Sequence, residues 1–429
     1  MRWSIYVVCF EFDDSVMLYK SITDGLFELP INEYKAIKVF LENGDGRYLS
    51  DITKKHISEL YLNKIIVDDN IDEAKLFKNE YLKRAAEAET GTVYFAPSFL
   101  CNLKCTYCII GERINHACHE KYMQSSVVEN SAEYVYKTTV RKGIKKLNII
   151  LYGGEPILAH TSNVLFINKM TELNYDQKIR IRYTLVTNGY EMPEDVINEL
   201  LDLGVDNLQV TLDGPAYIHD ARRIGAQGEK TFDVILQHLC EFSLKFKSVV
   251  IRINVDNTNV GSICELIDIL KDRELNKHCI LHLNLVDPSG YSDASGYNDE
   301  TTNYFDEIYR YAYFKGFRVA PWRRYCSMFD KMYLAIDSKG NIYNCPNYMD
   351  VMEKIVGNVC DLKYDDAINF GLDDRCVGCC FVGICNGGCE VMRQNSNVGT
   401  DYCFKNVNYQ MTKSYFGARY HRFSDKFVN

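Results

Sequence analysis

Residues 101–108 read Cys-Asn-Leu-Lys-Cys-Thr-Tyr-Cys and come shortly after the apolar run Thr92 to Ala96. Three cysteine thiolates in this CxxxCxxC spacing can hold three irons of a [4Fe–4S] cube and leave the fourth iron open to an outside ligand. A zinc site is the alternative, but structural zinc is usually closed by four ligands that come in CxxC-type pairs. The spacing therefore favours an iron–sulfur cluster on Cys101, Cys105 and Cys108.

Apolar strands alternate with helix-period segments from Thr92 onward. The segment Pro193 to Leu203 is the clearest helix, because proline lies in its first turn and Gly204 follows its end. Six such units, spaced by roughly 30 residues, predict an α/β domain in which a parallel sheet curls into a partial (β/α)6 barrel. In that architecture the chemistry lies at the C-terminal ends of the strands. The expected strands are Thr92 to Ala96, Leu147 to Tyr152, Arg182 to Thr187, Leu208 to Leu212, Val249 to Val255 and Ile280 to Val286.

Short polar segments end the second, third and fourth expected strands. The second ends in Tyr152-Gly153-Gly154-Glu155-Pro156, in which glycines allow a ligand to approach the backbone and a carboxylate can accept hydrogen bonds from an ammonium group. Asn188 and Asp213 end the next two strands, where turn formation is an equal alternative to ligand contact. The segment His219-Asp220-Ala221-Arg222-Arg223 follows, and we expect His219 to be structural rather than a base.

Together, the cysteine spacing and these strand ends resemble the radical S-adenosylmethionine (SAM) superfamily. The resemblance implies that SAM chelates the open iron and that an electron from the cluster cleaves SAM to a 5′-deoxyadenosyl radical, which abstracts hydrogen from the substrate. It also implies that Tyr107 lies against the adenine, Glu155 binds the amino group and Arg223 reaches the carboxylate. Arg252, Asn254 and either Asn284 or Leu285 could line the same cavity. The expected SAM-binding residues are Tyr107, Gly153, Gly154, Glu155, Asn188, Thr211, Arg223 and Leu285.

A second group of cysteines occupies the C-terminal part of the chain. Its spacing resembles the SPASM extension of radical SAM enzymes, which binds two auxiliary [4Fe–4S] clusters. Seven ligands leave one iron without a cysteine, so either another residue such as Cys360 closes that site or the site is open. A zinc ribbon is the alternative for this domain, and the remaining cysteines are expected to be small apolar residues. The resemblance assigns Cys326, Cys345 and Cys389 to the inner cluster and Cys376, Cys379, Cys385 and Cys403 to the outer one.

The N-terminal segment has three short β-like runs followed by helices. It resembles the winged-helix-like domain with which enzymes that mature ribosomally made peptides recognise a precursor, where the third strand and a helix hold the extended leader peptide. Adding a strand to a sheet edge binds a peptide through main-chain hydrogen bonds. An ordinary cap on the barrel is the alternative. The expected domains are a recognition domain (1–80), a helical connector (81–91), the barrel (92–316) and the SPASM domain (317–429).

Composition narrows the possible classes of protein. The 429 residues are enough for two or three domains, and 47% hydrophobic with 25% charged residues is typical of a soluble globular chain. The net charge of −9 disfavours a nucleic-acid partner. We expect no membrane association and a cytoplasmic location, because neither a spanning segment nor a signal peptide is apparent. Seventeen cysteines in such a chain indicate metal ligation or catalysis rather than disulfides.

The leading functional hypothesis is a radical SAM oxidoreductase that cross-links a precursor peptide through a thioether or carbon–carbon bond, with a flavodoxin or ferredoxin as electron donor. One alternative is oxidation of a protein Cys or Ser to formylglycine, as in anaerobic sulfatase maturation. In those relatives an aspartate follows the second SPASM cysteine and acts as base, whereas Pro346-Asn347 follows Cys345 here. The other alternative is an iron–sulfur electron carrier without SAM chemistry. The sequence singles out no catalytic base.

Overall fold

The computed structural model describes residues 1–47, 49–114, 121–286, 299–322, 327, 330–361, 372–389, 391, 403 and 405–420. The expected cluster ligand Cys326 and the remaining cysteine Cys118 lie outside the described residues.

Residues 1–67 form a small sheet covered by two helices. The sheet has the antiparallel order β2 (Val7–Glu11), β3 (Ser15–Lys20) and β4 (Gly25–Pro30). Helices α1 (Ile31–Asn43) and α2 (Asp51–Leu62) follow. The short strands β1 (Arg2–Trp3) and β5 (Ile66–Val67) pair with each other. All three predicted N-terminal strands are therefore present, and the winged-helix-like identity of this unit remains a prediction.

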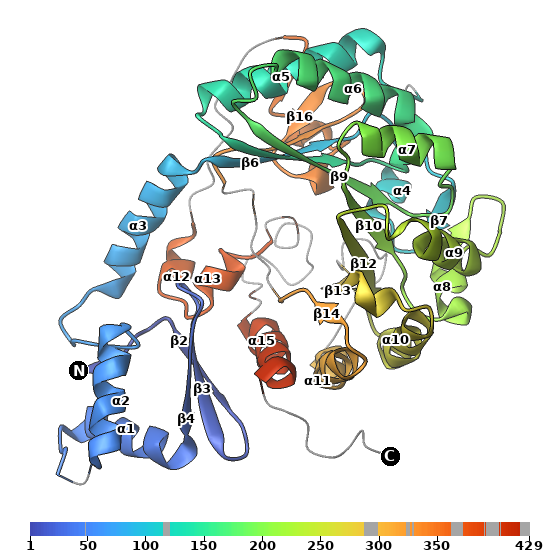
Figure 1. The fold of residues 1–429 in the computed structure, drawn as a ribbon. Helices are drawn as coiled ribbons and strands as arrows, with labels where there is room; N and C mark the ends of the chain where they lie inside the picture. Colours follow the sequence, from blue (N-terminus) through green and yellow to red (C-terminus); the bar gives the residue numbers. More distant parts are fainter. Residues whose placement is uncertain are drawn as a thin grey trace.

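A single long helix leads from this unit to the main sheet. Helix α3 (Glu73–Glu87) begins at Asp72, whose side chain accepts a hydrogen bond from the Lys75 N–H. Figure 1 shows α3 extending from the N-terminal unit toward the start of β6. At the base of α3, the buried carboxylate of Glu73 binds Arg2 at 2.7 Å and Ser4 at 2.6 Å, and so ties the N-terminus to the connector.

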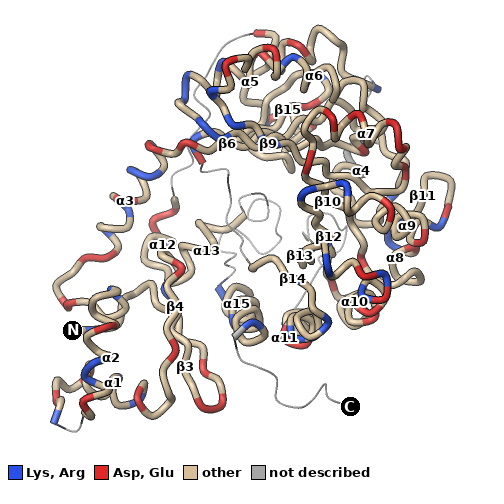
Figure 2. Tube along the Cα trace, viewed as in Figure 1, with Lys and Arg blue, Asp and Glu red and all other residues tan. Residues whose placement is uncertain are grey.

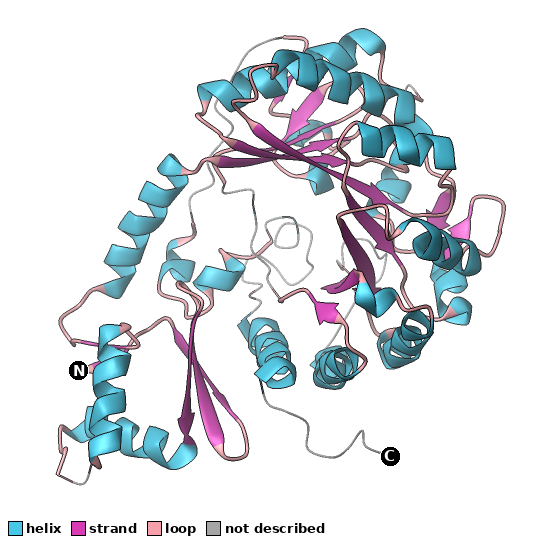
Figure 3. Ribbon diagram, viewed as in Figure 1, coloured by secondary structure: helices cyan, strands magenta, loops and turns pink. Residues whose placement is uncertain are grey.

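The six predicted barrel strands are confirmed and lie side by side in chain order, all parallel. Figures 1 and 3 show that the sheet is strongly curved, with its covering helices on the outer side. The strands are β6 (Thr90–Phe95), β8 (Lys146–Leu151), β9 (Arg180–Thr187), β10 (Asn207–Thr211), β12 (Ser248–Val255) and β13 (Cys279–Leu285). The outer helices are α5 (Ser125–Arg141), α6 (His160–Leu173), α7 (Glu194–Asp202), α9 (Phe232–Phe242), α10 (Ile263–Asp272) and α11 (Asp299–Phe314).

The sheet continues into the cysteine-rich C-terminal part. β14 (Arg318–Val319) pairs parallel with β13. β15 (Tyr333–Ile336) pairs parallel with β6 at the opposite edge. β16 (Asn341–Tyr343) and β17 (Gly357–Asn358) extend that edge in antiparallel fashion. Strands on both sides of the expected domain boundary between residues 316 and 317 thus share one ten-stranded sheet.

Alternate residues of the parallel strands face different environments. Val93, Ile149 and Ile251 belong to the main core beneath the outer helices. By the alternation of side chains along a strand, the neighbouring Tyr94 and Arg252 face the concave side. The largest apolar core therefore lies outside the sheet, and the concave side carries polar and aromatic residues. Figure 2 shows acidic and basic residues mixed along the outer helices.

Three helices of the C-terminal part stand beside the N-terminal sheet: α12 (Asp374–Val377), α13 (Val382–Cys385) and α15 (Lys405–Tyr420). Phe381 and Ile384 pack in one apolar cluster with Phe10, Met17 and Tyr19 of the sheet. The opposite face of the sheet packs against α1 and α2. Within the described ranges, no helix is both long and apolar enough to cross a membrane.

Candidate active site

The first cysteine group lies on a two-stranded ribbon that the sequence does not predict. β7 (Leu103–Cys105) pairs antiparallel with β11 (Arg223–Gly225), which places Arg223 directly opposite Cys105. The Thr106 N–H donates to the Arg222 carbonyl at 2.9 Å. This ribbon brings the cysteine segment to the carboxyl end of β10, because α8 (Ala216–Arg222) leads from β10 into β11.

Two of these cysteine sulfurs accept main-chain hydrogen bonds. The Leu103 N–H donates to Cys101 Sγ at 3.4 Å, and the Gly111 N–H donates to Cys108 Sγ at 3.3 Å. Burial raises the pKa of the Cys101 thiol to about 12, and burial also raises the pKa of Cys105 while the charge of Arg223 lowers it. The metal-free Cys101 thiol is therefore protonated at neutral pH, and binding iron would release its proton.

The donor set fits an iron–sulfur cluster. Within the described part of the chain, no three His, Cys, Asp or Glu side chains lie close enough to hold one metal ion together. A cube does not require this, because each thiolate binds a different iron. Three thiols on one loop can each bind a different iron, and two of their sulfurs also accept main-chain N–H bonds. A zinc site instead needs four ligands around one ion.

The end of β8 fits closely against the segment that leads to Cys101. A Cβ atom added to Gly154 would lie 2.2 Å from the Leu100 carbonyl oxygen, and one added to Gly153 would lie 2.2 Å from the Ser98 carbonyl oxygen. Gly153 also has a φ of +129°, which side-chain-bearing residues rarely adopt. The Glu155 N–H then donates to Leu100 O at 2.7 Å. Both glycines are required by backbone packing, which fixes Glu155 relative to the cysteine loop.

The Glu155 carboxylate is 1% exposed and is held by three donors. It accepts hydrogen bonds from the Asn188 N–H and the Thr187 hydroxyl, both at 2.7 Å, and from the Ile157 N–H at 3.0 Å. Burial nevertheless raises its pKa to about 7. Among the described residues no Lys, Arg or His forms an ion pair with it, so a cationic ligand group would compensate its charge.

Asn188 connects this carboxylate to the first cysteine. Its side-chain Nδ2 donates to Asn102 Oδ1 at 2.7 Å and contacts Cys101 Sγ at 3.7 Å. Asn188 therefore does more than form a turn: its main chain binds Glu155 and its side chain binds the cysteine loop.

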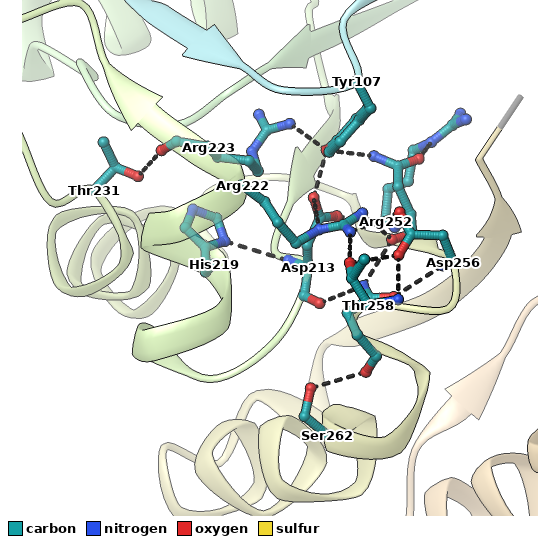
Figure 4. A network of polar contacts seen from close by, with 12 residues as sticks. Tyr107, Asp213, His219, Arg222, Arg223, Thr231, Arg252, Asp256, Thr258 and Ser262 are labelled. Atoms are coloured by element: carbon teal, nitrogen blue, oxygen red, sulfur yellow. Dashed lines mark hydrogen bonds and ion pairs between the residues drawn. The ribbon is translucent and has the colours of Figure 1, made fainter. Parts of the chain in front are cut away.

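Tyr107 is the centre of a buried polar network (Figure 4). Its hydroxyl donates to Asp213 Oδ2 and accepts hydrogen bonds from Arg223 Nη1 at 2.9 Å and from Asn254 Nδ2 at 3.1 Å. Asp213 is fully buried and also accepts the Asn254 N–H at 3.0 Å. The network joins the cysteine loop to the ends of β10 and β12, and it gives Asp213 a partner beyond its own turn.

The adjacent arginines Arg222 and Arg223 differ in their charge partners. Arg222 Nη1 lies 2.6 Å from Asp256 Oδ2, its Nε lies 3.6 Å from Asp213 Oδ2, and its guanidinium stands 4.9 Å from the Tyr107 ring centroid. Arg223 is 7% exposed, and within the described ranges it has no carboxylate in ion-pair distance and no partner for its Nε. Arg222 is neutralised, whereas Arg223 is a buried cation available to an anion.

The other predicted site residues are distributed as follows. His219 Nδ1 accepts the Asp213 N–H at 3.2 Å, and burial lowers its pKa well below the usual range, so the ring is neutral and structural. Thr211 is buried at the end of β10, with its Cα opposite that of Arg252. The Leu285 side chain packs into the main core, whereas the preceding Asn284 is half-buried. Only the main chain of Leu285 is thus available for a ligand on the concave side.

The C-terminal cysteines lie in two groups. Cys345 is buried with Phe99 in an apolar cluster, and Cys389 packs against the same cluster. Cys379 and Cys385 pack against the cluster between α13 and the N-terminal sheet. Cys376 lies on α12, and Cys403 is exposed. Cys360 is exposed and accepts a hydrogen bond from Asn130 of α5.

Sequence reasoning missed the residues that hold Arg222. Asp256 and Thr258 come from the turn after β12, where the Thr258 hydroxyl and N–H both donate to Asp256 Oδ1. Asn259 donates to the Asp213 carbonyl at 2.7 Å. The only signal in the sequence is the polar run Asp256-Asn257-Thr258-Asn259 after an apolar strand, which is indistinguishable from an ordinary turn.

Comparison with known sequences identifies the domain that carries this site. Residues 96–270 match the sequence model of the radical SAM superfamily. A cysteine-type anaerobic sulfatase-maturating enzyme of Clostridium perfringens is 23% identical over 338 residues, which cover 69% of this chain and 87% of the relative. The Fe-coproporphyrin III synthase of Methanosarcina barkeri is 23% identical over 231 residues, or 53% of each chain.

Two groups of solved structures share the fold. The enzyme anSMEcpe with bound AdoMet superposes with a TM-score of 0.59 at 18% identity, covering 79% of this chain and 97% of that one. Streptococcus suis SuiB bound to the precursor peptide SuiA gives a TM-score of 0.51 at 16% identity, covering 94% of this chain and 98% of that one. The chain therefore contains a radical SAM domain within an α/β fold similar to those of anSMEcpe and SuiB.

Proposed function

We propose that this protein is a radical SAM peptide maturase that modifies a ribosomally made precursor peptide, forming a thioether or carbon–carbon cross-link. The observation that carries the proposal is the meeting of the Cys101 loop, the buried Glu155 carboxylate and the buried Arg223 cation at the carboxyl ends of parallel strands, within a domain that matches the superfamily.

The site residues fit the two cofactors. Cys101, Cys105 and Cys108 would hold the [4Fe–4S] cluster, while Glu155 would accept the SAM ammonium and Arg223 its carboxylate. When bound, the cluster supplies the electron that cleaves SAM, and the radical produced abstracts hydrogen from the substrate. Glu155 requires a cation and Arg223 an anion, so an α-amino acid group satisfies both buried charges at once.

Two auxiliary clusters belong to the proposal. Cys345 and Cys389 share one apolar cluster, and Cys379 and Cys385 share another, which supports an inner and an outer site. Cys326 would complete the inner set, and Cys376 and Cys403 the outer one. Such clusters could accept the electron that the substrate loses on cross-linking, and a flavodoxin or ferredoxin would supply the reducing electron to the first cluster.

The N-terminal unit supports a peptide substrate. The superposition on SuiB covers 94% of this chain, so it includes most of residues 1–80, and the structure of SuiB contains a bound precursor peptide. One face of the β2–β3–β4 sheet packs against α1 and α2, and the other packs against α13. Within the described part of the chain, both faces of the sheet are thus covered and the strand edges are the part left for a partner.

The outer edge of β4 is suited to an added strand. The Ile31 N–H donates to the Asp14 carbonyl at 3.0 Å, so the alternation of antiparallel bonds turns the main-chain groups of Leu26 away from β3. Pro30, which lacks an N–H, falls at a further outward position, as expected on an edge. A leader peptide would pair with this edge by main-chain hydrogen bonds.

Oxidation of a protein Cys or Ser to formylglycine is the second candidate. The similarity to the Clostridium perfringens sulfatase-maturating enzyme favours it. Against it stands the segment after Cys345, where Pro346 begins a short 3₁₀ turn and no aspartate follows the cysteine. An electron carrier without SAM chemistry would leave the charges of Glu155 and Arg223 without a use.

The test is anaerobic reconstitution with iron and sulfide, followed by incubation with SAM and a strong reductant. Three cubes require about twelve irons per chain. We expect formation of 5′-deoxyadenosine, and its loss in a Cys101→Ala/Cys105→Ala/Cys108→Ala variant that retains about eight irons. Peptides encoded beside the gene are then incubated with the enzyme and their masses compared. Absence of nucleoside from a fully loaded protein would exclude the radical mechanism, and formylglycine in a sulfatase peptide would favour the second candidate.

A further inference from the structure

We propose that Arg223 sets the reduction potential of the first cluster, and that Tyr107 is the positioning residue that holds Arg223 beside Cys105. The inference rests on the proposed function, because it presumes a [4Fe–4S] cluster on Cys101, Cys105 and Cys108. It assigns Arg223 a role toward the cluster in addition to any contact with SAM.

The register of the β7–β11 ribbon places Arg223 at the cluster. Arg223 and Cys105 are direct partners across the two strands, so their side chains leave the ribbon on the same side. Lys104 and Ile224 are the neighbouring pair and point to the other side, where Lys104 is exposed. Of the two cations on the strands β7 and β11 themselves, Lys104 and Arg223, only Arg223 lies on the Cys105 side of the ribbon.

The guanidinium is held by one hydrogen bond, and among the described residues no carboxylate lies within ion-pair distance of it. Arg223 Nη1 donates to the Tyr107 hydroxyl at 2.9 Å, and Tyr107 in turn donates to the buried Asp213. Both carboxylates of the network, Asp213 and Asp256, lie within 4 Å of Arg222 instead. A buried cation without a partner is costly. The nearest group that becomes anionic on cluster assembly is the Cys105 thiolate, its cross-strand partner.

A fixed cation beside a cluster thiolate favours the reduced state of the cluster. Reduction adds one electron from the donor to the cube, so the added negative charge is stabilised by a nearby positive charge that water does not screen. Net charge and hydrogen bonds around the sulfurs are known determinants of cluster potential. Arg223 therefore raises the potential of the first cluster and makes it easier for a protein donor to reduce.

The experiment is a redox titration of the reconstituted full-length protein without SAM, followed by electron paramagnetic resonance. The signal of the first cluster is identified as the one missing from the triple alanine variant. We expect Arg223→Gln to shift its midpoint potential to more negative values, Arg223→Lys to restore part of the shift, and Tyr107→Phe to give a smaller shift in the same direction.

Lys104→Gln is the matched control, because it removes the same charge one residue from Cys105 on the opposite side of the ribbon. Its potential should equal that of the wild type. Equal shifts in Lys104→Gln and Arg223→Gln would replace the proposal by a general effect of net charge. An unchanged potential in a fully loaded Arg223→Gln protein, with SAM binding alone weakened, would overturn it.

Two further results separate this inference from the proposed function. If Arg223→Gln loads no cluster, Tyr107→Phe decides, because it keeps the cation and removes the bond that orients it, together with the hydroxyl's bonds to Asp213 and Asn254. An unchanged potential in that variant overturns the proposal. If the wild type loads the cluster but cleaves no SAM, the proposed function fails while the potentials still test Arg223.

Discussion

Gly383 of α13 lies so close to Ser21 of the N-terminal unit that a Cβ on Gly383 would stand 2.0 Å from the Ser21 carbonyl oxygen. This contact joins the segment bearing Cys379 and Cys385 to the sheet proposed to bind the leader peptide. The Tyr6 hydroxyl donates to the Val377 carbonyl at 2.6 Å across the same interface. The arrangement makes docking of the two parts sensitive to a single methyl group.

Gly383→Ala is expected to loosen the N-terminal unit without unfolding it, because that unit has its own core around Val16 and Leu18. Overpacking of this kind typically costs about 1–3 kcal/mol. Hydrogen–deuterium exchange should rise in residues 1–20 at the interface, and proteolysis within α3 should become faster. Gly378→Ala is the control, since nothing lies within 4 Å of its added Cβ. Equal exchange in the two variants would contradict the prediction.

Leu26→Pro is expected to weaken leader-peptide binding about tenfold or more, because it removes an outward N–H of the β4 edge. The bonds between β3 and β4 should survive, since the Leu26 N–H does not take part in them. Fluorescence anisotropy with the peptide found by mass comparison measures the effect. Leu26→Ala is the control and keeps the N–H. If both variants bind alike, the leader does not pair with β4.

The parallel strands could be predicted from the sequence, because each is an apolar run bounded by polar turns. The glycines and Glu155 could be predicted as a site because they end such a run. The pairing of β15 with β6 could not, since four residues carry no signal for a partner more than 230 positions away. The ribbon that places Arg223 opposite Cys105 has three residues per strand, and such short strands likewise carry no sequence signal for their pairing. Arg222, rather than Arg223, forms the ion pair with Asp256. Asp256 lies in a turn that the sequence does not distinguish from any other polar turn, so this difference could not be predicted.

Gly154→Ala is expected to displace the Cys101 loop, because its Cβ would meet two backbone carbonyl oxygens, of Leu100 at 2.2 Å and Phe99 at 2.3 Å. Backbone atoms cannot rotate away as a side chain can, so we expect a loss of roughly 3 kcal/mol or more in stability and reduced iron at the first cluster. Iron content and thermal unfolding measure this. Gly261→Ala, where nothing lies within 4 Å, should behave as the wild type. A fully loaded Gly154→Ala protein of wild-type stability would refute the close fit.

Glu155 is expected to make the SAM-free protein less stable as pH rises. Its folded-state pKa of about 7 lies above the ordinary value of 4.5, so the stabilising contribution is complete below about pH 4.5 and is lost as pH rises through 7. The loss amounts to roughly 3 kcal/mol. Glu155→Gln cannot ionise, so the unfolding temperature of the wild type should fall relative to that of Glu155→Gln between about pH 4.5 and 7 and run parallel to it above pH 8. A constant difference across this range would show that Glu155 titrates normally.

SAM binding should show the opposite dependence on pH, because the ligand ammonium needs the ionised carboxylate. Affinity is expected to rise up to tenfold per pH unit below about 7 and to level off above it. The cluster carries negative charge and would raise the pKa of Glu155 further, which moves the plateau to higher pH but leaves the direction unchanged. Glu155→Gln should bind about 10–100-fold more weakly above pH 7, since it loses a charge-assisted hydrogen bond, and should show no such slope. Calorimetry on the oxidised, cluster-loaded protein at several pH values measures both quantities. A slope that persists in Glu155→Gln would assign the titrating group elsewhere and leave the buried carboxylate without a role in holding the ammonium.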